Sequence, residues 1–103
     1  MARTVTRPVP APDPLARDMA TLGLLVRNRR AQSELGIVDA ADQLGVSKSA
    51  LSRLENGQPV NLDMLFRVLN GLGLSMLVVS KHEALKAMRA LQPSPPASSQ
   101  ERV

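Results

Sequence analysis

The sequence predicts an all-α fold of five short helices, with one short β-strand close to its C-terminus. Hydrophobic residues make up 44% of the 103 residues but Phe66 is the one aromatic, so the core must be aliphatic. Apolar residues recur at spacings of three and four, as they do on one face of a helix. Capping residues and glycines divide these apolar stretches into short segments, which favours small packed helices.

The ordered domain is expected to span residues 14–91, between two segments of different composition. Residues 1–13 contain three prolines together with Arg3 and Arg7 and show no periodicity, which predicts a disordered arm. Residues 92–103 are rich in Pro and Ser and predict a disordered tail. The sequence shows no apolar leader and no apolar run of about 18 residues, so no membrane span is expected.

The first helix is expected to begin at Pro14, with Asp13 as its N-cap, and to end near Arg30. Its apolar face would consist of Leu15, Met19, Leu22 and Val26. The run from Arg27 to Arg30 has two interpretations. It is either a clamp for phosphate groups or an ordinary charged helix end, favourable beside the C-terminal carbonyls.

The second and third helices are expected at residues 37–44 and 48–55. Gly45 is suited to end the second helix in the left-handed conformation, which costs glycine nothing. Ser47 is suited to cap the third helix by accepting a hydrogen bond from a first-turn N–H. The buried face of this third helix would consist of Leu51 and Leu54.

The last part of the domain is predicted to contain a helix, a strand and a further helix. Asn61 would cap the fourth helix, which ends near Gly71 and Gly73. Its inward residues would be Leu62, Leu65, Phe66 and Leu69. Residues 74–80 are rich in Val and Leu and predict a strand, although they could instead extend the fourth helix. Residues 81–91 predict a short fifth helix.

A lone strand leaves its backbone polar groups without partners, and the rest of the sequence offers no second strand. The same strand of a second subunit, paired antiparallel across a two-fold axis, would satisfy them. A homodimer also suits a domain this small, since its single core is only marginally stabilising. The predicted dimer interface consists of Leu74, Met76, Leu77, Val78 and Val79.

The third helix carries small and basic residues on the side opposite its leucines. Lys48, Ser49, Ser52 and Arg53 follow one another at i, i+1, i+4 and i+5 and form one exposed stripe. Two short helices joined by a glycine turn match the helix-turn-helix geometry, in which the second helix enters the major groove. The net charge of +4 favours such an anionic partner. Double-stranded DNA is the predicted partner, and a merely solvated helix face is the alternative.

The segment LGVSKSALSRLENG, residues 44–57, resembles the Xre family of lambda-repressor and Cro type. The resemblance implies a compact five-helix, lambda-repressor-like domain in a bacterial, cytoplasmic and nucleoid-associated protein. It places Lys48, Ser49, Ser52 and Arg53 against bases, and Ser47, Asn56 and Gln58 near phosphates. It further implies that Glu55 forms a structural ion pair with Arg30. Gly36-Ile37 stands where many members have Thr-Gln, so the backbone contact of that glutamine is missing.

The segment LGLSMLVVS, residues 72–80, resembles the HipB-type antitoxins, in which such a strand pairs between subunits. That resemblance implies a HipA-type kinase toxin as a further partner and repression of the protein's own operon. The sequence therefore predicts one of two functions: a DNA-binding repressor, or an interaction module that mainly sequesters a partner protein. An enzyme is not expected, because the chain has no Cys and one His, no phosphate-binding glycine loop and no clustered carboxylates. No catalytic residue, metal or cofactor is predicted, and His82 is assigned to the surface.

Overall fold

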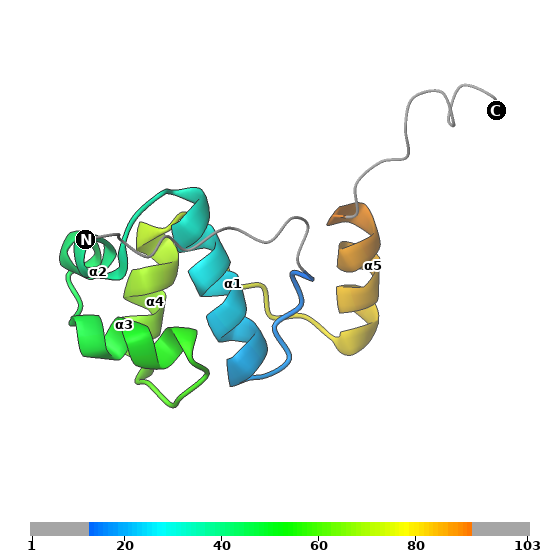
Figure 1. Cartoon of the computed structure of the whole chain (residues 1–103). Coiled ribbons are helices and arrows are strands. Elements are labelled where there is room, and N and C mark those ends of the chain that lie inside the picture. Colours follow the sequence, from blue (N-terminus) through cyan, green and yellow to red (C-terminus); the bar gives the residue numbers. More distant parts are fainter. Residues whose placement is uncertain (1–12, 92–103) are drawn as a thin grey trace, which may run out of the picture.

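The computed structural model describes residues 13–91, and this part of the chain folds into five helices. They are α1 (Met19–Gln32), α2 (Ile37–Leu44), α3 (Lys48–Glu55), α4 (Leu62–Gly71) and α5 (Lys81–Leu91). The first four pack against one another, whereas α5 stands apart at the end of an extended segment (Figure 1). The all-helical prediction is confirmed for the described part. The predicted arm, apart from Asp13, and the predicted tail lie outside it.

The first helix begins five residues later than predicted. Asp18, not Asp13, is its N-cap, and one carboxylate oxygen accepts hydrogen bonds from both the backbone N–H and the hydroxyl of Thr21, each at 2.8 Å. These bonds lower the pKa of the Asp18 carboxyl below its ordinary value. Asp13 instead accepts from the N–H of Leu15, two residues on, and so forms a turn rather than a helix start.

The bounds of the other four helices agree with the prediction, because local signals fix them. Asn61 caps α4 by accepting from the Met64 N–H at 2.7 Å. Gly45 follows α2 with φ +71° and ψ +32°, and its N–H and that of Val46 bond to the last carbonyls of α2. This arrangement is a Schellman motif, which ends a helix and turns the chain sharply. The turn sets the angle between α2 and α3.

The core lies between α1, α2, α3 and α4 and is aliphatic throughout. Its fully buried side chains are Val26, Ala40, Leu51, Leu54 and Val68. The predicted inward face of α4 is half wrong: Leu65 and Leu69 are buried, but Leu62 and Phe66 are 66% and 45% exposed. The buried residues of α4 lie at i, i+3 and i+4, from Leu65 to Leu69, because that face meets α2 and α3. Leu62 and Phe66 fall on its solvent-facing flank.

Residues 74–80 are neither helical nor, within residues 13–91, part of a strand. The alternative that they extend α4 is wrong, since the N–H of Leu74 bonds to the Leu69 carbonyl and closes the helix. Leu74 is half-buried against the core. Leu77 and Val78 are 70% and 85% exposed, and no residue of α5 is buried. The fifth helix is therefore not part of the compact unit that was predicted.

Candidate nucleic-acid interface

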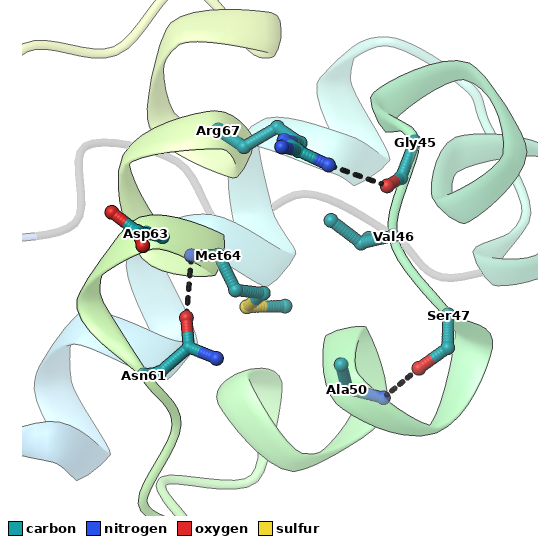
Figure 2. A pocket seen from close by; sticks show the side chains of 8 residues that line it. All are labelled: Gly45, Val46, Ser47, Ala50, Asn61, Asp63, Met64 and Arg67. Carbon is teal, nitrogen blue, oxygen red and sulfur yellow. Dashed lines mark hydrogen bonds between the residues drawn. The ribbon is translucent and has the colours of Figure 1, made fainter.

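Helix α3 packs against the core through one face, and a side-chain cap stabilises its N-terminus. Leu51 and Leu54 are 0% exposed, so the opposite face must point to solvent. Ser47 accepts a hydrogen bond from the Ala50 N–H at 3.0 Å, which fixes the first turn (Figure 2). The sequence predicted both the cap and the buried pair. Together they present the remaining side chains of α3 as one rigid outer face.

The four residues predicted to read bases lie together on that face. Lys48, Ser49, Ser52 and Arg53 line one shallow depression of about 360 Å³. The guanidinium of Arg53 reaches toward the loop after α3, where it donates to the Pro59 carbonyl at 3.4 Å. Two cations and two hydroxyls on one short helix can donate to phosphates and to guanine acceptors in a major groove. We refer to these four residues as the α3 polar face.

The residues predicted to contact phosphates flank the two ends of α3. Ser47 lies at its start, and Asn56 and Gln58 lie in the loop that follows. The side-chain amide of Asn56 donates to the Ser52 carbonyl at 2.8 Å and thereby caps the helix. The Gln58 N–H bonds to the Arg53 carbonyl, while the Gln58 side chain is exposed.

The predicted ion pair between Arg30 and Glu55 is present and buried. Nε and Nη2 of Arg30 each donate to one carboxylate oxygen of Glu55 at 2.7 Å, in two-pronged geometry. Both side chains are 5% exposed. A third donor of Arg30 bonds to the Leu35 carbonyl at 2.9 Å. This pair ties the end of α3 to the end of α1 and so orients the α3 polar face.

Two arginines in the run from Arg27 to Arg30 make contacts within the domain. Arg30 is buried in its pair with Glu55, and Arg29 donates through Nε to the Leu72 carbonyl at the end of α4. Arg27 is exposed and Asn28 is buried. The two arginines at the helix end therefore join α1 to α3 and to the end of α4, and phosphate binding by this run stays a prediction.

Gly23, in the second turn of α1, positions α3, and the sequence alone did not predict this role. A Cβ at this position would meet the carbonyl oxygen of Leu54 and lie 2.8 Å from that of Glu55. The absence of a side chain lets α1 lie directly on the last turn of α3. An isolated glycine within an apolar helix was the available signal, since such a residue often marks close packing.

The start of α2 lacks the side-chain cap that the other packed helices have. Gly36 occupies the N-cap position, and no side-chain hydrogen bond is made there. The first-turn N–H groups of α2 therefore have no side-chain acceptor at the N-cap, and backbone N–H groups at a helix start attract phosphate.

Three further observations concern the described part of the chain. His82 is exposed on α5, as predicted. Within residues 13–91 no three metal-ligating side chains lie close enough together to hold an ion. None of the helices in this part is long and apolar enough to pass through a lipid bilayer.

Comparison with known proteins agrees with this geometry. A family model described as a helix-turn-helix domain matches residues 21–81, more than half of the chain. The match covers α2, the glycine turn and α3, together with most of α1, all of α4 and the extended segment. A search of the curated proteins found no match. The chain belongs to the helix-turn-helix family of DNA-binding domains.

Proposed function

We propose that this protein is a sequence-specific transcriptional repressor that binds an inverted-repeat operator as a homodimer in the bacterial cytoplasm. The α3 polar face carries the proposal, because four residues able to bond DNA occupy one exposed depression of α3. The net charge of +4 supports it. Lys48, Ser49, Ser52 and Arg53 would contact bases, and Ser47, Asn56 and Gln58 would contact phosphates. Repression follows if the operator overlaps a promoter.

Arg53→Ala tests the base-reading role. If Arg53 binds a guanine through two hydrogen bonds, its loss should cost on the order of 1–3 kcal/mol on the preferred duplex. Binding to unrelated duplexes should change little. Fluorescence anisotropy with labelled duplexes of both kinds measures the two affinities. Arg89→Ala, which removes the same charge from α5, is the matched control. Equal weakening on every sequence would mean that Arg53 contacts phosphate instead.

The dimer is proposed to form through residues 74–79, where the exposed apolar residues gather. Met76, Leu77, Val78 and Val79 are all exposed in the single chain, and their extended backbone lacks a ladder within residues 13–91. Antiparallel pairing with a second copy would satisfy those backbone groups and cover the side chains. The half-buried Leu74 would anchor the ladder to the core. The likeness to HipB-type antitoxins supports the same arrangement.

Leu77→Glu tests this interface. A charge in the proposed ladder should weaken dimerisation about 100-fold, or close to 3 kcal/mol, because it would be buried without a partner. Sedimentation equilibrium should give twice the 11.1 kDa chain mass for the wild type and a lower mass for the variant. Leu24→Glu is the matched control, since Leu24 is 61% exposed on α1. A monomeric wild type, or an equal effect of the control, would refute the interface.

A second function is favoured by one observation on α4. Leu62 and Phe66 lie one turn apart, exposed, and outside both the α3 polar face and residues 74–79. Surface apolar pairs of this kind suit contact with another protein. The pair supports the alternative of an interaction module that mainly sequesters a partner protein, for which a HipA-type kinase is the candidate, with weak or no specific DNA binding. A kinase-like reading frame directly beside the gene would favour this function over a repressor acting alone.

A further inference from the structure

A second depression lies beside α3, on the side of the α2–α3 turn. It has a volume of about 250 Å³ and separates the turn at Gly45 to Ser47 from the first turns of α4 (Figure 2). Arg67 crosses it from α4, and its Nη1 donates to the Gly45 carbonyl at 3.1 Å. Its aliphatic stem lies over the glycine, with Cδ 3.9 Å from where a Cβ would be. A single side chain of α4 thus reaches the turn.

The Gly45 carbonyl is well suited to such a donor. The N–H groups of Gly45 and Val46 donate to the carbonyls of Asp42 and Ala41 in the last turn of α2. Both backbone donors of the turn are therefore paired within the Schellman motif. The carbonyl of Gly45 itself points out of that motif toward α4 (Figure 2). Arg67 therefore bonds to a group that the turn does not use internally.

Electrostatics favour the same contact. The C-terminal end of a helix carries a partial negative charge, which a nearby cation stabilises. Helix α2 has no basic residue in its last turn, and it contains two carboxylates, Asp39 and Asp42. The cation that faces this end comes from Arg67, 22 residues further along the chain. Its guanidinium thus offsets an unfavourable charge distribution at the end of α2.

We propose that Arg67 is a positioning residue for DNA reading: it braces the α2–α3 turn from α4 and thereby fixes the angle at which α3 meets the groove. The proposal rests on the proposed DNA-binding function. Base contacts require α3 to be placed within about half an ångström, whereas non-specific phosphate binding tolerates misplacement. Loss of the brace should therefore lower affinity for the preferred site more than affinity for unrelated duplexes.

The first arm of the test needs no DNA. Residue-resolved hydrogen exchange would compare Arg67→Met, which keeps most of the stem, with Arg67→Lys and the control Arg89→Met. Exchange of the Gly45 and Val46 N–H groups should accelerate about tenfold in Arg67→Met, as expected for a lost hydrogen bond to a charged group at a partly exposed site. Amides of the core, such as Val68, should not change. Arg67→Lys should restore most of the protection, and unchanged turn amides would overturn the brace.

The second arm measures binding of the same three variants to the preferred duplex and to a random duplex over a range of salt concentrations. The ratio of specific to non-specific affinity should fall about tenfold in Arg67→Met and recover in Arg67→Lys, with the salt slope unchanged. An equal loss on both duplexes, with the log–log slope reduced by about 0.9, would make Arg67 a phosphate contact and overturn the proposal. If the wild type binds no duplex, the proposed function fails while the exchange data still report on the brace.

Discussion

Glu55→Ala is expected to destabilise the protein by about 3–5 kcal/mol, the usual cost of removing one partner of a buried ion pair. The substitution would leave Arg30, which is 4% exposed, without its two hydrogen bonds to the carboxylate. Its remaining hydrogen bond would be the one to the Leu35 carbonyl. Its charge cannot reach water without moving the end of α1. Urea unfolding followed by circular dichroism at the helix band measures this loss, since the chain has no Trp or Tyr.

The control for this prediction is the exposed pair of Arg17 and Asp13, with nitrogen and oxygen 3.5 Å apart. Arg17→Ala should cost no more than about 0.5 kcal/mol, because a solvated pair contributes little. The double variant Arg30→Met, Glu55→Leu should be less destabilised than Glu55→Ala, since it leaves no unpaired charge. A cost below about 1 kcal/mol for Glu55→Ala would show that the pair does not hold α1 to α3.

Gly23→Ala is expected to destabilise the protein by about 3 kcal/mol, although alanine is the better helix former by about 1 kcal/mol. The new Cβ would meet the carbonyl oxygens of Leu54 and Glu55, and backbone atoms cannot rotate away from it. Helix α1 must then move off the last turn of α3. Because that movement also strains the Arg30–Glu55 pair, binding to DNA should weaken together with stability. Urea unfolding and duplex titration of the same sample measure both.

Gly71→Ala supplies the matched comparison. There the added Cβ would meet the end of the Leu44 side chain, which can adopt another rotamer. The net cost should stay within about 1 kcal/mol. If Gly23→Ala costs as little as Gly71→Ala, the close approach of α1 to α3 is not required for the fold.

The bounds of α2 and α3 could be predicted because their signals are local. Gly45 and Ser47 act on hydrogen bonds within a few residues of themselves. The start of α1 could not be predicted, because Asp13 and Asp18 offer the same capping chemistry. In the structure Asp18 is the N-cap, and Met19 and Leu22, which follow it, pack against the core.

Other features depend on contacts distant in the sequence. The spacing of apolar residues in α4 does not determine which side of the helix faces the core, so it does not reveal that Leu62 and Phe66 are exposed. The contact between Arg67 and Gly45 joins a side chain to a carbonyl 22 residues away, for which no pattern exists. The α3 polar face was predictable since a short helix with one apolar side must expose the other. Pairing of residues 74–79 stays a prediction, because its partner would be a second chain.

Selection of duplexes from a random DNA pool by the purified protein tests the central claim most directly. The four side chains of the α3 polar face and the proposed dimer predict convergence on an inverted repeat whose half-sites lie about 34 Å apart. Affinity for the selected site should fall with salt at a log–log slope of about −0.9 for each neutralised phosphate. Recovery of no preferred sequence at moderate salt would contradict sequence-specific regulation.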